Sequence, residues 1–250
     1  MSNEFPLPDV PAVVRWGIPM IAVIIAALFV AAVRFVSNGS RKATVLSAAG
    51  VLVWLGATAL LALSGALLRF DLKPPPMALM FVVIIGGAIA LGLSRVGGAL
   101  AKLPLWVLVL AQGFRFPLEL VMHEAAVSGV MPTQMSYTGF NYDIVTGVTA
   151  LLLGGALYTR RAPPALVWIW NVWGCIALTA IAVVALASSP MLRAFGDDAL
   201  NTWVLHFPYV WLPAVMVLAA VLGHVVVFRR LASRQSPDTA LSSSPAMEER

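Results

Sequence analysis

A row of four polar side chains is the feature of this sequence most able to carry chemistry. Arg115, Glu119 and His123 follow one another at intervals of four residues, and Gln112 precedes them by three. Side chains three or four residues apart lie on the same face of an α-helix, so the four form one stripe. The sequence therefore predicts a site along this stripe, inside the polar segment 112–143.

The chemistry of the stripe depends on how Arg115 is paired. Arg115 and Glu119 lie one helical turn apart, so we expect them to form an ion pair. A guanidinium presents a rigid fork of donors that suits a carboxylate, a phosphate or a lipid headgroup, and Glu119 could carry a proton. The structural alternative is that the two charges only neutralise each other and fix the helix register.

Further polar side chains are expected to reach this stripe from the outer loops. The segment 129–143 is too short and too polar to cross a membrane, so it should form an outer loop or partial helix folded over the site. We predict that Arg115, Glu119, His123 and Asp143 meet in one cavity reached from the outer face. The full set of candidate ligand-binding residues is Gln112, Arg115, Glu119, His123, Tyr137, Asn141, Asp143 and His206.

A divalent metal site is an alternative use of the same residues. Glu119 and His123 have the spacing that lets two side chains bind one ion, and a third protein ligand would leave a place for water. His123 and Glu124 match the start of the HExxH motif, but Val127 stands where its second histidine belongs. The candidate metal ligands are Glu119, His123, Glu124 and His206. No other cofactor is predicted.

Two further polar residues lie deep in apolar stretches. His224 falls near the inner end of the last predicted span, about 27 Å along the helix axis from His206, so we do not expect the two histidines in one cluster. Asn171 is expected to bond a neighbouring helix.

The rest of the chain has the composition of a membrane scaffold. Hydrophobic residues make up 60% of the 250 residues and charged residues only 11%, which excludes an ordinary soluble domain. A spanning helix needs about 20 mostly apolar residues. Seven stretches meet this need, approximately at residues 15–35, 43–68, 77–93, 103–126, 143–158, 165–188 and 207–228.

These spans predict the fold class, an all-α membrane protein built as a bundle of seven transmembrane helices. The bundle forms a single domain over residues 1–232. The segment 233–250 is rich in serine, proline and charge, so we expect a disordered cytoplasmic tail.

The basic residues indicate how the bundle is oriented. Ten of them fall on one side of the predicted membrane: Arg34, Arg41, Lys42, Arg95, Lys102, Arg160, Arg161, Arg229, Arg230 and Arg234. By the positive-inside rule this side is cytoplasmic, which places the N-terminus outside and the C-terminus in the cytoplasm of a bacterial inner membrane. The net charge of +5 is spread over short loops, so we interpret it as a topology signal and expect no nucleic-acid partner.

The predicted function follows from a polar stripe inside an apolar bundle. We expect an outward-opening pocket on the fourth span that binds, transports or senses a small polar or anionic molecule, a lipid headgroup or a proton. The first alternative is a membrane-embedded, metal-dependent hydrolase that uses Glu119 and His123. The second is a structural or assembly partner of another membrane protein. A binding role is favoured over an enzymatic one, and the lipid bilayer is the one partner that the composition requires.

Overall fold

The computed structural model describes the backbone of residues 5–241 and the side chains of residues 5–233. Within these residues it is all-helical, without strands. The α-helices are α1 (Ala12–Val36), α2 (Arg41–Leu63), α3 (Pro76–Leu93), α4 (Arg95–Leu100), α5 (Leu105–Leu110), α6 (Arg115–Val127), α7 (Asp143–Tyr158), α8 (Ala165–Ala187) and α9 (Leu218–Leu241). Short 3₁₀ turns are η1 (Ala66–Leu68), η2 (Ala111–Phe114), η3 (Thr133–Met135), η4 (Asp197–Ala199) and η5 (Trp203–Leu205), and η6 (Leu212–Val217) is a π-helix.

Six helical stretches are long and apolar enough to cross a membrane, compared with the seven that we predicted. They are Ala12–Val36, Arg41–Leu63, Pro76–Leu93, Leu105–Val127, Ala165–Ala187 and Leu212–Ser233. The remaining predicted span is present as α7, which has 16 residues and is shorter than a full span. The membrane-protein class is therefore supported by six helices, and α7 differs from the others in length.

The last span begins and ends later than predicted. We placed it at 207–228, but its helix begins at Leu212 with Pro213 in the first turn, where the missing backbone N–H of proline does no harm. Its helical backbone continues as α9 to Leu241, so it includes the first residues of the predicted tail. The rest of that tail, 242–250, lies outside the described residues.

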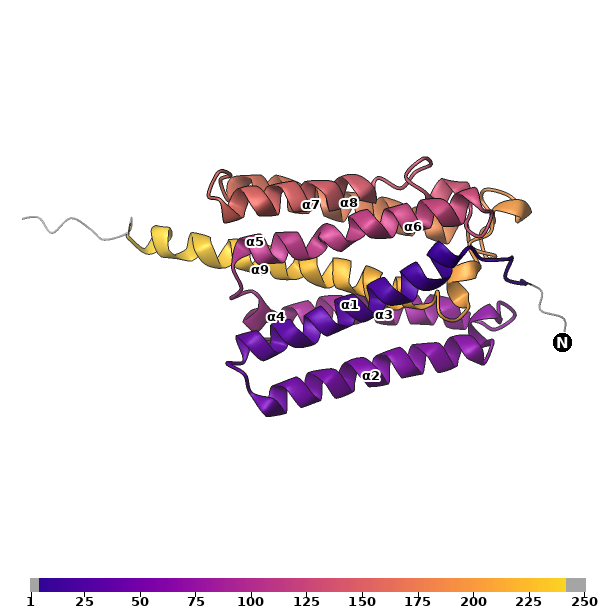
Figure 1. The fold of residues 1–250 in the computed structure, drawn as a ribbon, viewed down its shortest axis with the longest axis horizontal. Helices are drawn as coiled ribbons and strands as arrows, with labels where there is room; N and C mark the ends of the chain where they lie inside the picture. Colours follow the sequence, from indigo (N-terminus) through magenta and orange to yellow (C-terminus); the bar gives the residue numbers. More distant parts are fainter. Residues whose placement is uncertain (1–4, 242–250) are drawn as a thin grey trace, which may run out of the picture.

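The helices lie side by side with their long axes roughly parallel (Figure 1). In this view α2 lies at one edge, α7 and α8 lie at the opposite edge, and α9 runs between them. The π-helix η6 and α9 together contact α1, α3, α5 and α8. The last span is therefore the central element of the bundle, and its side chains meet most of the other helices.

Two indole groups join the outlying helix α2 to η6. Trp54 donates its Nε1–H to the carbonyl of Ala214 at 2.8 Å, and Trp211 donates its Nε1–H to the carbonyl of Leu55 at 3.2 Å. Hydrogen bonds from side chains to backbone carbonyls between helices are valuable where lipid offers no alternative partner. They fix the start of the last span against α2.

The short helix α7 starts in the middle of the bundle. Its first residue, Asp143, lies against Arg115, which is twelve residues before the end of α6 at Val127. That separation corresponds to roughly 18 Å at about 1.5 Å per residue. The connection 128–142 fills the space beyond the start of α7, and its Met131, Met135 and Ser136 are buried. Non-helical backbone at this depth is tolerated because protein surrounds it.

The span that carries the polar stripe is not one continuous α-helix. It consists of α5, the 3₁₀ turn η2 and α6. Pro117 in the first turn of α6 cannot donate a hydrogen bond to the carbonyl of Gly113, and this is the physical reason to expect an interruption here. Close packing against α7 is possible because Gly147 has no side chain: a Cβ there would overlap the backbone of Phe116.

Candidate functional site

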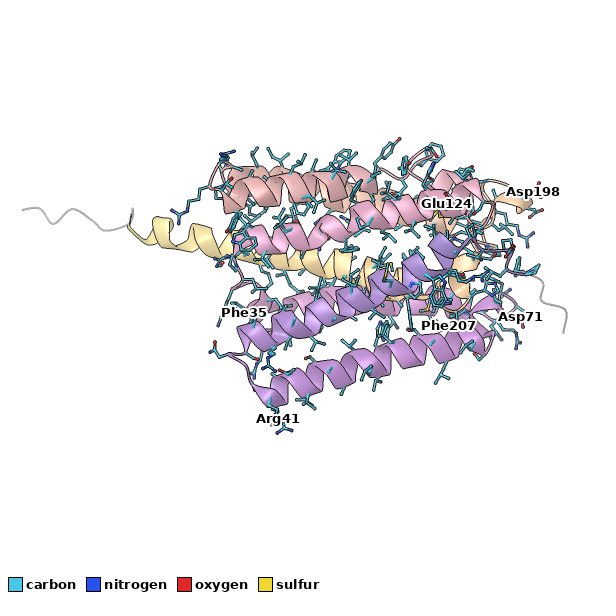
Figure 2. The ribbon with its side chains drawn as sticks, viewed as in Figure 1. Phe35, Arg41, Asp71, Glu124, Asp198 and Phe207 are labelled. Atoms are coloured by element: carbon cyan, nitrogen blue, oxygen red, sulfur yellow. The ribbon has the colours of Figure 1, made fainter. Side chains whose placement is uncertain are left out.

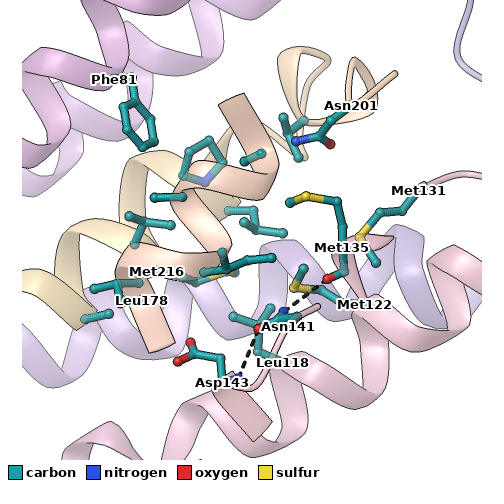
Figure 3. A pocket seen from close by; sticks show the side chains of 18 of the residues that line it. Phe81, Leu118, Met122, Met131, Met135, Asn141, Asp143, Leu178, Asn201 and Met216 are labelled. Atoms are coloured by element: carbon teal, nitrogen blue, oxygen red, sulfur yellow. Dashed lines mark hydrogen bonds between the residues drawn. The ribbon is translucent and has the colours of Figure 1, made fainter. Parts of the chain in front are cut away.

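A cavity of about 320 Å³ lies between α3, α6, α8 and η6 (Figure 3). Its walls are mostly apolar and include six methionines, whose flexible side chains adapt to irregular ligands: Met77, Met80, Met122, Met131, Met135 and Met216. Its polar lining residues are Arg115, Glu119, Asn141, Asp143 and Asn201. The arrangement is typical of a small-molecule site, with apolar walls and a few convergent polar groups.

The cavity reaches the side of the bundle between α3 and α8. Val82 on α3 and Leu186 on α8 both line it, and they are 68% and 49% exposed. The connections 128–142 and 188–211 cover it at one end of the bundle, since Met131 and Trp203 line it and are each only 2% exposed. These positions favour an entrance through the side of the bundle rather than the outer-face entrance that we predicted.

Arg115 is held from two directions by residues of other helices. Its Nε lies 2.8 Å from Oδ2 of Asp143 at the start of α7, and its Nη1 lies 3.0 Å from Nε2 of His224 on α9. Arg115 is only 1% exposed. The ion pair that we predicted between Arg115 and Glu119 is therefore wrong, because the first turn of α7 brings the carboxylate of Asp143 to the guanidinium instead.

The hydrogen bonds fix the tautomer of His224. A guanidinium only donates, so Nε2 of His224 must accept, and the proton of a neutral imidazole is then on Nδ1. Nδ1 lies 2.8 Å from Oδ1 of Asn171 and can donate to it, while Nδ2 of Asn171 donates to the backbone carbonyl of His224 at 3.2 Å. The predicted bond from Asn171 to a neighbouring helix is thus confirmed.

Glu119 is bound by a residue of the inserted connection. Nδ2 of Asn141 donates to both carboxylate oxygens of Glu119, at 2.9 and 2.8 Å, and to the carbonyl of Met135 at 3.1 Å. Oδ1 of Asn141 accepts from the backbone N–H of Asp143 at 3.0 Å. Asn141 therefore connects the carboxylate on α6 to the first turn of α7.

The buried acidic side chains at this end of the cavity outnumber the buried cation. Arg115 supplies one cation, whereas Glu119 and Asp143 supply two carboxylates, and His224 is neutral in the hydrogen-bonding arrangement above. Only Asp143 lies at ion-pair distance from the guanidinium among the described residues. Glu119 is 1% exposed and has an amide as its partner. An additional anion here would compete with Asp143 for Arg115 and would lie beside a second carboxyl group.

Glycines leave room for the polar contacts between helices. A Cβ on Gly174 of α8 would overlap the imidazole of His224, and a Cβ on Gly223 of α9 would overlap the side-chain amide of Gln112. Gln112 is 3% exposed, and its Nε2 donates to the carbonyl of Ala219 at 3.5 Å. Gln112 does not line the cavity, and the partner in this hydrogen bond is a backbone carbonyl.

Three further predicted site residues, His123, Tyr137 and His206, lie away from the cavity lining. His123 stacks on Tyr137, with ring centroids 4.5 Å apart, and its Nδ1 lies 3.0 Å from the hydroxyl of Ser136. His206 donates from Nε2 to the carbonyl of Phe5 at 3.1 Å. Burial lowers the pKa of His206, and its bond to Phe5 partly opposes this. The predicted meeting of His123 with Arg115, Glu119 and Asp143 in one cavity is therefore wrong.

The metal alternative required Glu119 and His123 to bind one ion together with a third ligand such as Glu124 or His206, and these side chains do not converge. Among the residues that the structure describes, no three His, Cys, Asp or Glu side chains lie close enough together to hold a metal ion. The reason is geometric: the carboxylate of Glu119 faces Asn141, while the two histidines bind Ser136 and Phe5.

His224 is the main residue that our prediction left out of the site. It lies deep in the bundle, near Arg115, because the last span begins at Leu212 and not at Phe207. A polar side chain within a long apolar span was the available signal, because such residues face the bundle interior and find partners there. The same signal pointed correctly to Asn171.

Comparison with known proteins identifies a family for this chain. Residues 73–232, more than half of the chain, match the family described as domain of unknown function (DUF8737), and the chain belongs to it. No curated protein and no solved structure matches the chain significantly. The matched region runs from just before α3 into α9 and contains every residue that lines the cavity.

Proposed function

We propose that this member of the DUF8737 family is an integral membrane protein that binds an amphipathic small molecule in the cavity between α3, α6, α8 and η6. The apolar part of the ligand would lie on the methionine-rich walls, and its polar end would meet Arg115, Glu119 and Asn141. The observation that carries the proposal is a largely apolar cavity of about 320 Å³ that ends at buried, mutually bonded polar groups.

The charges at the polar end indicate which headgroups fit. Arg115 already has Asp143 as its counter-ion, and Glu119 brings a second carboxyl group to the same end of the cavity, so an anionic headgroup is disfavoured. Nη2 of Arg115 is buried and has no hydrogen-bond partner among the described residues, so it can donate to a ligand oxygen. A neutral headgroup that both donates and accepts, such as a hydroxyl or an amide, satisfies these groups best.

The π-helix η6 supports a functional role for this cavity. Four of its residues, Leu212, Pro213, Met216 and Val217, line the cavity. Isolated π-helical turns within longer helices occur frequently at functional sites, where they displace side chains from the regular helical register. Here the π-turn precedes the α-helical segment that carries His224.

We also propose the topology that the sequence predicted: seven helices with α7 as the short one, the N-terminus outside, the C-terminus in the cytoplasm, and location in a bacterial inner membrane. Charge supports this orientation. Arg41 lies at one end of the bundle, whereas Asp71 and Asp198 lie at the other (Figure 2). The positive-inside rule then assigns the end with Arg41 to the cytoplasm.

Ligand binding is tested with a panel of molecules that share one chain and differ in headgroup. Purified protein in detergent is mixed with dodecanol, dodecylamine or dodecanoate near pH 7.5, and bound ligand is counted by native mass spectrometry. Dodecanol should bind at least about tenfold more tightly than dodecanoate, a difference of about 1.4 kcal/mol. Equal binding of the alcohol and the carboxylate, or no binding of either, contradicts the proposal.

A matched pair of variants locates the bound ligand. Ala182 lines the cavity from α8, whereas its neighbour Val183 is 60% exposed and lies outside the lining. Ala182→Phe should fill the cavity and abolish ligand retention, while Val183→Phe should leave it unchanged. If the two variants bind alike, the ligand does not occupy this cavity. Movement of bound ligand between leaflets of proteoliposomes would extend the binding role to transport.

A further inference from the structure

A second cavity, of about 480 Å³, lies at the inner end of the bundle, far from the site described above. It is bounded by the connection between α4 and α5, the end of α7, and α9. Three basic residues from these three places line it: Lys102, Arg160 and Arg230. Trp106 and Leu157 contribute apolar parts of the wall. We refer to it as the inner basic pocket.

The cations of the inner basic pocket have no acidic partner among the described residues. None of the ion pairs within residues 5–233 involves Lys102, Arg160 or Arg230. The acidic residues of that range lie elsewhere, in the outer segments or in the cluster around Arg115: Asp9, Asp71, Glu119, Glu124, Asp143, Asp197 and Asp198. Three like charges therefore share one cavity without a counter-ion among the described side chains.

Arg229 and Arg230 are adjacent but differ in what they bind. Arg229 donates from Nη1 to the carbonyls of Gly92 and Ser94, at 2.6 and 2.8 Å, and so stabilises the end of α3. Nε of Arg230 is buried and has no hydrogen-bond partner among the described residues, although Arg230 lines the pocket. The hydrogen bonds of Arg229 therefore explain its presence by a structural role. Arg230 lines the pocket, and its Nε–H has no partner among the described residues.

Arg160 adopts a backbone conformation that favours glycine. Its φ is +58°, in the left-handed region, directly after the end of α7. Glycine is the usual residue at this position after a helix, because other residues carry a steric cost there. A positive charge is thus present where local backbone preference alone would select a residue without a side chain.

Aromatic residues place the inner basic pocket at the level of lipid headgroups. Trp106, in its wall, packs edge-to-face on Tyr158, with ring centroids 5.0 Å apart. Tryptophan and tyrosine concentrate at the membrane–water interface. Tyr158 is 66% exposed on the side of the bundle, next to Leu157 of the pocket wall. The pocket therefore borders both the apolar side of the bundle and its charged inner end.

We propose that the inner basic pocket binds the phosphate group of an anionic phospholipid. Basic pockets between helices at the cytoplasmic side of membrane proteins are suited to such headgroups. Lys102, Arg160 and Arg230 would surround the phosphate, and Trp106 and Leu157 would contact the start of the acyl chains. Free phosphate shares the charged part of this chemistry, but the apolar wall favours a phosphate that carries a lipid. The site is independent of the proposed ligand cavity.

The proposal is tested by counting lipids on the detergent-purified protein. Native mass spectrometry compares phosphatidylglycerol with phosphatidylcholine of the same acyl chains, and inorganic phosphate is added in a third arm. Phosphatidylglycerol should be retained selectively and should resist millimolar phosphate. Each basic residue near a membrane surface contributes roughly a fivefold change in affinity, so Arg160→Gln should lower retention by about that factor, and Arg160→Gln with Arg230→Gln by more.

Adjacent residues provide the control. Arg161 is exposed and does not line the pocket, so Arg161→Gln removes the same charge from the same loop. Retention that falls equally in Arg160→Gln and Arg161→Gln shows only general attraction and overturns the proposal. Displacement of the lipid by phosphate overturns the lipid assignment.

A second substitution separates lipid binding from folding. Arg160→Gly relieves the left-handed backbone, so in lipid-free detergent its melting temperature should equal or exceed that of the unaltered protein. It should still lose phosphatidylglycerol. If Arg160→Gly retains the lipid as well as the unaltered protein does, the proposal is wrong.

Discussion

Arg115 and His224 lie 109 positions apart in the sequence, yet Nη1 of the arginine is 3.0 Å from Nε2 of the histidine in the middle of the bundle. This contact joins the span that carries the polar stripe to the central span α9. It also requires a neutral imidazole with its proton on Nδ1, which Asn171 accepts from α8. One arginine thereby couples α6, α7, α8 and α9, through Asp143 on one side and His224 on the other.

The unequal charges of the cluster predict unequal costs for removing its members. Arg115→Gln leaves two buried carboxylates without a cation and should lower the free energy of unfolding by about 3–5 kcal/mol. Asp143→Asn keeps an amide oxygen that can still accept a hydrogen bond from Arg115, so its cost should be smaller. Unfolding titrations with SDS in mixed micelles measure both values. The opposite order of the two costs would contradict this prediction.

The double variant Arg115→Gln/Asp143→Asn tests whether the two residues act as a pair. Two neutral amides can still bond each other, so the double variant should be destabilised by less than the sum of the single variants. For directly contacting residues we expect a coupling of about 0.5–3 kcal/mol. Additive effects would mean that the 2.8 Å contact contributes nothing to stability.

Gly174 tests whether the position of His224 matters for stability. Gly174→Ala places a Cβ against the imidazole, so His224 must move and its bonds to Arg115 and Asn171 must weaken. A cost of about 1–3 kcal/mol is expected for such overpacking. Gly155→Ala is the matched control, because nothing lies within 4 Å of its added Cβ and alanine favours the helix. Equal melting temperatures for the two variants would contradict this prediction.

Glu119→Gln is expected to change headgroup preference more than stability. Glutamine keeps an oxygen that can accept from Nδ2 of Asn141, but it removes one of the two carboxyl groups at the cavity. Binding of dodecanoate should therefore rise by about tenfold relative to dodecanol. Glu124→Gln, on the exposed face of the same helix, should leave this ratio unchanged. A ratio that does not change in Glu119→Gln places the headgroup elsewhere.

The hydrogen bond between His206 and Phe5 is expected to make the stability of the fold depend on pH. Burial lowers its pKa below the ordinary value near 6.5, so the unfolded chain binds the proton more readily than the folded one. Neutral His206 therefore contributes its full stabilisation of the folded state above about pH 6.5. This contribution is lost as the pH falls through the lower pKa that His206 has in the folded chain. The melting temperature should decrease between about pH 7.5 and 5.5, and less so in His206→Gln, which can still donate to Phe5. The same decrease in both proteins would exclude His206 as the cause.

The sequence predicted well those features that depend on local composition. Apolar stretches of about 20 residues identify spanning helices without knowledge of their neighbours. Each helix that crosses a bilayer must by itself be long and apolar enough and must satisfy its own backbone hydrogen bonds. Six were confirmed as long, apolar helices, and the limits of α7 at Asp143 and Tyr158 agree with those predicted. Arg115, Glu119, Asn141 and Asp143 were all among the candidate site residues, and all four line the cavity.

The partners of these residues were decided by tertiary structure alone. Helical spacing predicted that Arg115 would pair with Glu119, its neighbour on the stripe, but the depth at which α7 starts gave it Asp143, and the register of the last span gave it His224. These two contacts depend on how far the connection 128–142 enters the bundle and on the start of the last span at Leu212. Such depths arise from packing between segments remote in sequence. Composition therefore determined a membrane bundle with a buried polar row, whereas packing decided which charges meet and that an apolar cavity lies beside them.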